Sequence, residues 1–200
     1  MKLAKSLDRL GTETAFSVLA EAKKLEAKGK PMIHLGLGQP DFKTPKHIVD
    51  AAKKALDDGH HGYVLSNGIL ECRQAVTRKI KKLYNQDIDP ERIIIMPGGK
   101  PTMSYAIQCF GEPGVEIVHP TPAFPIYESM INFTGAKPVP YDLTEDKDLK
   151  FNPEKILSLI TEKTKLLILI NPNNPTGSFV DKSDIDVLAE GLKKHPHVTI

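Results

Sequence analysis

Residues 166–177 read LLILINPNNPTG, and this stretch predicts the fold of the chain. Its first five residues form a continuous apolar run, which is typical of a strand buried on both faces of a parallel sheet. Its last seven residues, 171–177, are turn formers. Because open α/β sheets bind ligands at the loops that leave the carboxyl ends of their strands, the stretch indicates a core strand that carries an amide-rich loop to a site. The alternative is a strand followed by a proline-rich turn without a ligand.

Strands and helices alternate through the rest of the second half. Apolar runs predict strands at 93–96, 116–118, 137–140 and 166–170, with a further strand beginning at 198. Helical segments lie between them, such as 153–160, which Asn152 can cap. This alternation predicts an α/β fold with a mostly parallel sheet flanked by helices and joined by right-handed crossovers.

The first half of the chain is richer in helical patterns. Apolar spacing and end signals predict helices at 12–28, 45–56 and 67–84, with Thr12, Thr44 and Asn67 as their caps. A short strand is expected at 33–35. Gly36 and Gly38 follow that strand, and they indicate a sharp turn whose backbone N–H groups a ligand can approach closely. A simple interdomain turn is the alternative.

Composition excludes several classes of protein. The 200 residues are 40% hydrophobic and 26% charged, with a formal net charge of +2 and mixed signs along the chain. That mixture argues against a nucleic-acid-binding face. No apolar run approaches membrane-spanning length, and the first residues lack the apolar core of a signal peptide. Two cysteines without motif spacing, Cys72 and Cys109, indicate free thiols in a reducing cytosol, so a cytoplasmic location is expected.

No metal site is predicted. His60 and His61 are adjacent in a loop, and His195 and His197 are two residues apart, but neither pair has a cysteine or carboxylate partner at a ligand spacing. We interpret these histidines as solvated loop residues.

Two further loops could share a site with 171–177. Gly98, Gly99 and Lys100 lie between the expected strand 93–96 and a helix, and a glycine turn at a helix N-terminus favours an anion. Its spacing is neither a Walker loop nor GxGxxG, and a plain strand-to-helix connection is the alternative. Phe124, after strand 116–118, could stack on a flat ligand or pack in the core. Together the three loops describe a pocket for a flat, phosphorylated, heteroaromatic molecule.

Several motifs resemble those of class I/II aminotransferases, which are pyridoxal-phosphate enzymes of fold type I. They are GLGQPDF at 36–42, Tyr63 with GILECR at 68–73, GGK at 98–100, PTPAFPIYES at 120–129 and NPNNPTG at 171–177. They occur in the family's order and cover nearly the whole chain. The resemblance implies transfer of an amino group from an L-amino acid to a 2-oxo acid, with pyridoxal 5'-phosphate as cofactor.

The resemblance also assigns roles to residues. Gly98, Gly99 and Lys100 form the phosphate loop, with N–H groups of Gly99 and Lys100 on the phosphate. Phe124, where many relatives have Trp or Tyr, stacks on the pyridine ring, and Asn174 bonds the ring hydroxyl oxygen. Gly38 lies by the substrate carboxylate. Tyr63 reaches the phosphate of the neighbouring subunit, which implies a homodimer with shared sites.

The family's Schiff-base lysine, and with it every catalytic residue, is expected beyond residue 200. We therefore expect residues 1–45 to be an N-terminal arm and part of a small domain, and 46–200 to be the first part of the cofactor-binding large domain of a longer enzyme. The 200 residues alone are expected to be inactive, to bind the cofactor weakly, and to form no borohydride-reducible bond with it.

Three alternatives stay open. A C–S or C–N lyase of the same fold shares these N-terminal motifs. A non-catalytic protein could retain the cofactor pocket. An unrelated α/β enzyme could bind a nucleotide phosphate at the Gly-Gly-Lys turn, although no Walker or dinucleotide signature supports it.

Overall fold

The computed structural model describes residues 2–11, 14–145 and 148–200. These residues form two compact units. The first, the sheet unit, consists of the described residues among the first 14 together with Gly99–Ile200. The second, the helical unit, is Ala15–Gly98.

A parallel sheet of three strands organises the sheet unit. The strands are β1 (Glu116–Thr121), β2 (Lys137–Asp142) and β3 (Thr164–Leu167), in the order β2-β1-β3. Ile117 lies opposite Pro138 on one side and opposite Leu166 on the other. A parallel bridge between Leu166 and Thr199 continues the sheet beyond β3, as the predicted strand at 198 requires.

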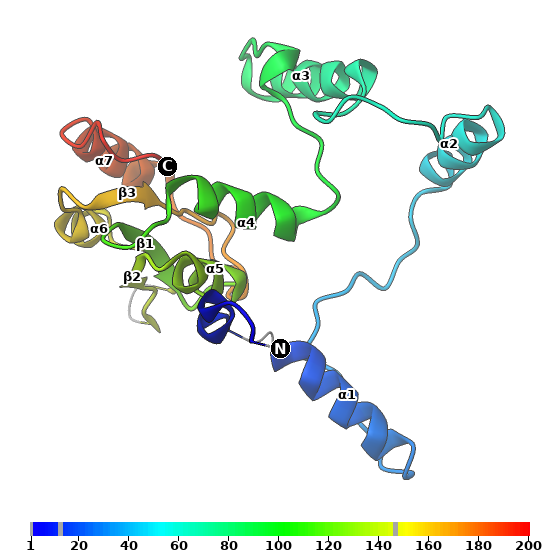
Figure 1. Cartoon of the computed structure of the whole chain (residues 1–200), viewed down its shortest axis with the longest axis horizontal. Coiled ribbons are helices and arrows are strands. Elements are labelled where there is room, and N and C mark those ends of the chain that lie inside the picture. The colour runs from blue at the N-terminus through cyan, green and yellow to red at the C-terminus, as the bar shows by residue number, and fades with distance from the viewer. Residues whose placement is uncertain (1, 12–13, 146–147) are drawn as a thin grey trace. The chain divides into compact units, whose positions relative to one another are not determined.

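Helices cover both faces of this sheet (Figure 1). They are α4 (Gly99–Phe110), α5 (Ile126–Thr134), α6 (Pro153–Leu159) and α7 (Lys182–Leu192). Alternate residues of β1 face opposite ways, so Ile117 packs with Ile107 of α4 and Ile131 of α5, whereas Val118 packs in a second cluster. That second cluster includes Ile156 of α6 and Leu188 of α7. The predicted α/β architecture with a mostly parallel sheet is confirmed.

Strand β2 lies at the edge of the sheet and contains two prolines, Pro138 and Pro140. The backbone N–H of Lys137 donates to Val115 O, and that of Leu143 donates to Thr121 O. Since donors alternate sides along a strand, the prolines fall at positions whose N–H would point away from β1. The edge strand therefore contains proline without losing a bond to its neighbour.

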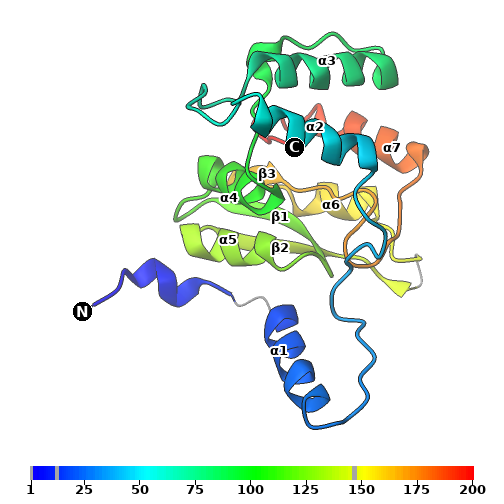
Figure 2. The same cartoon turned by 90° about the vertical axis from the view of Figure 1, so that its right-hand side faces the viewer.

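The N-terminal 3-10 helix η1 (Lys5–Arg9) is fastened to α5. Arg9 donates from Nε to Asn132 O at 2.8 Å and from Nη2 to Phe133 O at 2.9 Å. These carbonyls belong to the last turn of α5, where a helix has no intrahelical donors left. Figure 2 shows α4 and α5 running side by side within this unit.

The helical unit contains α1 (Thr14–Glu26), α2 (Lys46–Asp57), α3 (Leu70–Tyr84) and the 3-10 helix η2 (Pro90–Arg92). Among its residues whose burial is described, 16–98, only Ala22 and Arg73 are buried. α1 and the segment 32–37 enclose a small cavity of about 140 Å³. α2 contributes no buried residue at all.

Two predicted strands are wrong. Residues 33–35 and 93–96 form no strand, and the exposed fractions of Ile33 and Ile94 are 86% and 63%. A strand requires a neighbour that satisfies its backbone groups, and the backbone N–H of Ile95 donates instead to Asn67 O, in a loop, at 3.1 Å. An apolar run alone does not supply that neighbour.

Helix starts were predicted less well than helix ends. Helix α2 begins after Pro45 and α3 after Ile69, without a side-chain cap, so the predicted caps Thr44 and Asn67 are wrong. Thr12 lies outside the described residues. In contrast, Asn152 caps α6 as expected, because its Oδ1 accepts a hydrogen bond from Lys155 N at 2.8 Å.

No helix in the described part of the chain is long and apolar enough to cross a membrane.

Candidate functional site

The loops that follow the strands of the sheet unit leave from one edge, because β1 and β3 are parallel. The loop after β1 carries Phe124, and the loop after β3 carries Asn174. Helix α4 contributes its N-terminus, at Gly99.

The Gly-Gly-Lys turn forms the start of α4. Gly98 has a φ of +104°, which glycine adopts without strain, and its N–H donates to Met96 O at 2.8 Å. The helix that begins at the next residue is 12 residues long. Backbone N–H groups in a first helical turn, together with the positive end of the helix dipole, favour an anion. The Gly98 amide is used within the turn, so Gly98 contributes through its conformation.

Lys100 connects this turn to the aromatic loop. Its Nζ lies 5.7 Å from the centroid of the Phe124 ring, in the range of a cation–π contact, and the Phe124 side chain is half-buried. Two of the predicted site residues, one at a helix start and one after a strand, are therefore neighbours. This is the arrangement expected when strand and helix ends meet at one edge of the sheet.

The loop 171–177 is fastened to the Phe124 loop by Asn173. Its Nδ2 donates to Pro122 O at 3.3 Å and to Thr176 Oγ1 at 2.8 Å, and the residue is buried. Its backbone N–H donates to Ser178 O, and its carbonyl accepts from Gly177 N. Asn174, the next residue, is exposed. A rigid loop therefore presents the Asn174 side chain to solvent at this edge.

Sequence reasoning missed the part played by Asn173, since the other six residues of 171–177 are turn formers too and the pattern does not single it out. It also missed Tyr141 of β2, whose hydroxyl donates to Ile168 O at 3.0 Å, directly after β3. Burial raises the pKa of Tyr141 well above its usual value, so its hydroxyl stays a donor. A tyrosine directly after the predicted strand 137–140 gave no signal of this long-range bond.

His119 of β1 is a buried titratable group near the same end of the sheet. Its Nδ1 contacts Pro120 O at 3.1 Å, and its Nε2 has no hydrogen-bond partner among the described residues. Burial lowers the pKa of His119, partly offset by the Pro120 carbonyl and the charge of Glu128. Burial therefore favours the neutral form of this histidine.

Tyr63 and Gly38 belong to the helical unit and stay predictions. The Tyr63 side chain is fully exposed. A Cβ built on Gly38 would meet no atom within 4 Å, and the N–H of the next residue, Gln39, donates back to Leu37 O.

An apolar groove of about 310 Å³ runs between α4, the residues 166–169 and Ile200. No group of three or more His, Cys, Asp or Glu side chains in the part of the chain that the structure describes is placed to hold a metal ion.

Comparison with known proteins identifies the family. The family model of aminotransferase class I and II matches residues 30–200. The chain is 35% identical over 195 residues to the aspartate aminotransferase of Bacillus subtilis, covering 98% of this chain and 50% of that protein. It is 42% identical over 158 residues to a probable aspartate aminotransferase of Methanocaldococcus jannaschii, covering 79% of this chain and 42% of that protein.

Solved structures agree with the sequence comparison. The aspartate aminotransferase of Rhizobium meliloti superposes with a TM-score of 0.92 at 29% identity, over 99% of this chain and 50% of that one. The aspartate aminotransferase of Thermus thermophilus with maleate gives a TM-score of 0.92 at 30% identity, over 98% and 51%. This chain thus spans about half the length of the relatives it matches. On the matching model and the shared fold, the chain belongs to the class I and II aminotransferases.

Proposed function

We propose that this chain is part of a pyridoxal-phosphate enzyme that transfers an amino group from an L-amino acid to a 2-oxo acid. The observation that carries the proposal is the contact between Lys100, in the first turn of α4, and the ring of Phe124. This contact places a helix N-terminus, which favours an anion, beside an aromatic ring. A planar ring that carries a phosphate requires both. Family membership supplies the reaction class.

The residues fit that cofactor in chemical type. The N–H groups of Gly99 and Lys100 would hold the phosphate, the Phe124 ring would stack on the pyridine ring, and the Asn174 amide would donate to the ring hydroxyl oxygen. When bound, pyridoxal phosphate supplies an electron sink for the charge that develops at the substrate α-carbon. Each of these side chains serves binding and orientation, and none of them transfers the proton.

The remaining assignments complete the proposal. Gly38 would place its N–H by the substrate carboxylate, and Tyr63 would bind the phosphate of a second subunit in a homodimer. The complete exposure of Tyr63 supports a contact outside its own chain. Two free cysteines support a reducing, cytoplasmic compartment. The domain division at residue 45, and a covalent lysine outside residues 1–200, remain part of the proposal.

The test uses the full-length protein that contains this chain. Loaded with pyridoxal phosphate, it should convert 2-oxoglutarate to glutamate with one or more L-amino acids, and L-aspartate is the first donor to try because several relatives are named for it. Release of ammonia without an oxo acid would favour a C–S or C–N lyase. Cofactor binding without either reaction would favour a non-catalytic protein.

The 200-residue chain gives a second test. Incubated with pyridoxal phosphate and borohydride, it should show no stoichiometric adduct by intact mass. An adduct at one specific lysine would overturn the assignment of the covalent lysine to another part of the protein.

A further inference from the structure

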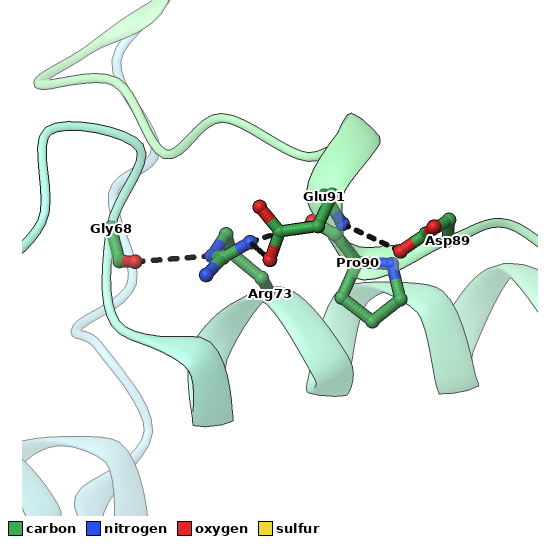
Figure 3. A network of polar contacts seen from close by, with 5 residues as sticks. All are labelled: Gly68, Arg73, Asp89, Pro90 and Glu91. Atoms are coloured by element: carbon green, nitrogen blue, oxygen red, sulfur yellow. Dashed lines mark hydrogen bonds and ion pairs between the residues drawn. The ribbon is translucent and has the colours of Figure 1, made fainter.

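Arg73 of α3 is a buried cation in a unit that buries almost nothing else. Its exposed fraction is 2%. Nε donates to Gly68 O at 3.1 Å, and Nη1 donates to Pro90 O at 3.0 Å and to Glu91 Oε1 at 2.7 Å (Figure 3). A buried guanidinium is tolerated when such partners replace its water. The contacts join two separate segments, the loop before α3 and the turn η2.

A second set of contacts fastens the same two segments. Ile95 N donates to Asn67 O at 3.1 Å. Gly68 has a φ of +95°, and a Cβ built on it would lie 2.7 Å from Ile95 Cγ1, so only glycine permits this approach. η2 is itself fixed, since Asp89 Oδ1 accepts from Glu91 N at 2.9 Å (Figure 3). We call this arrangement the Arg73 clamp.

The clamp lies between Tyr63, which is proposed to bind a phosphate, and Gly98, whose conformation shapes the start of the phosphate loop. Tyr63 precedes Asn67 by four residues, and Gly98 follows Ile95 by three. Arg73 bonds to Gly68, Pro90 and Glu91, so its effect on Tyr63 and Gly98 passes through the backbone of the two clamped segments. A short backbone displacement is enough to matter, because misplacing a positioned group by about 1 Å can lower a reaction rate about a hundredfold.

We propose that Arg73 is a positioning residue for the cofactor phosphate, holding the segment that leads to Tyr63 against the segment that leads to Gly98. This inference rests on the proposed function. It adds that phosphate recognition depends on a group that never touches the phosphate. Lysine cannot replace Arg73, since the clamp uses donors that leave a planar guanidinium in different directions, toward two carbonyls and a carboxylate.

The test compares variants of the full-length protein. Arg73→Met removes the clamp, Arg73→Lys keeps only the charge, and Glu91→Gln keeps an oxygen acceptor without the charge. Lys81→Met is the matched control, because Lys81 is on the same helix and its 2.6 Å ion pair with Asp87 is exposed. If Arg73→Met does not fold, the other two clamp variants carry the test.

Two measurements follow, each at a temperature where circular dichroism shows the variant folded. Without cofactor, the amide of Ile95 should exchange hydrogen about tenfold faster in Arg73→Lys, and at the wild-type rate in Lys81→Met. The dissociation constant for pyridoxal 5'-phosphate should rise about tenfold, while that for pyridoxal, which lacks the phosphate, should change less than about twofold. Glu91→Gln should lie between Arg73→Lys and wild type.

The outcomes separate a positioning role from a structural one. Equal loss of affinity for both compounds would mean that Arg73 only stabilises the fold, and would overturn the inference. Faster exchange with unchanged affinity for pyridoxal 5'-phosphate would overturn it as well. Wild-type protein that binds neither compound would instead overturn the proposed function, and the phosphate assignment with it, whereas the exchange rates would still report whether the clamp exists.

Discussion

The sheet unit and the helical unit bury their apolar residues very differently. In the sheet unit, the two faces of β1 each meet a cluster of buried side chains. In the helical unit, Leu35, Leu56 and Val64 are 90%, 62% and 65% exposed. The helices of both units have apolar faces, so pattern alone does not decide burial. The difference teaches that a central strand, whose two faces both need cover, organises a core that separate helices do not form.

The largest expected effect contrasts a core isoleucine with an exposed one. Ile156 of α6 has no exposed surface, whereas Ile48 of α2 is 51% exposed. Ile156→Ala should reduce the free energy of unfolding by about 3–4 kcal/mol, by lost burial and the cavity left behind. Ile48→Ala should cost less than about 1 kcal/mol. Urea denaturation measures both losses. Losses of similar size would contradict the difference in apolar burial between the two units.

The second effect is a pH dependence of the stability of the sheet unit. Because burial lowers the pKa of His119, the unfolded chain binds the proton first as the pH falls below about 6.5. The contribution of His119 to the free energy of unfolding is therefore fully present above that pH. It is lost as the pH falls toward the pKa of His119 in the folded state, with a limiting slope of about 1.4 kcal/mol per pH unit. His119→Leu should flatten this slope between pH 7 and 5. An unchanged slope in chemical denaturation would contradict the assignment.

The third effect concerns helix starts. Asn152 caps α6 through its side chain, whereas α2 and α3 start without such a cap. Asn152→Ala should cost about 1 kcal/mol, because Lys155 N loses its acceptor. Asn152→Asp, which keeps an oxygen acceptor, should retain most of that stability. The midpoint of thermal unfolding of the two variants gives the answer, and equal midpoints would show that the cap contributes nothing.

The smallest effect is expected for the exposed ion pairs of the helical unit. Nζ of Lys54 in α2 lies 2.6 Å from Oδ2 of Asp58, the residue directly after the helix, and the two side chains are 75% and 42% exposed. Lys54→Ala should change the free energy of unfolding by no more than about 0.5 kcal/mol, since solvent screens the pair. A loss above about 1 kcal/mol would show that α2 is more firmly integrated than its exposure indicates.

The strands that sequence predicted correctly are those with neighbours in the described chain. The runs at 116–118 and 137–140 lie in β1 and β2, which pair with each other. The run at 166–170 is only partly β3, which ends at Leu167. The run at 93–96 is also apolar but forms no strand, because pairing requires two segments and an apolar run describes only one.

In the candidate site and the Arg73 clamp, too, sequence predicts some contacts and not others. The closeness of Lys100 and Phe124 follows from strand and helix ends, so sequence could predict that these residues meet. Asn173 and Arg73 act through bonds to carbonyl groups at Pro122, Gly68 and Pro90. Every residue has a carbonyl, so no pattern of side chains marks which one will accept a bond. That information exists only once the backbone is folded.

The prolines of β2 determine at which edge the sheet can accept a further strand. Pro138 and Pro140 stand where the outer edge would otherwise offer N–H donors to another chain, and they leave that edge unable to recruit a further strand there. The opposite edge, beyond β3, already accepts Thr199. Any strand added to this sheet must therefore join on the β3 side, and β2 protects the protein against edge-to-edge aggregation on the other.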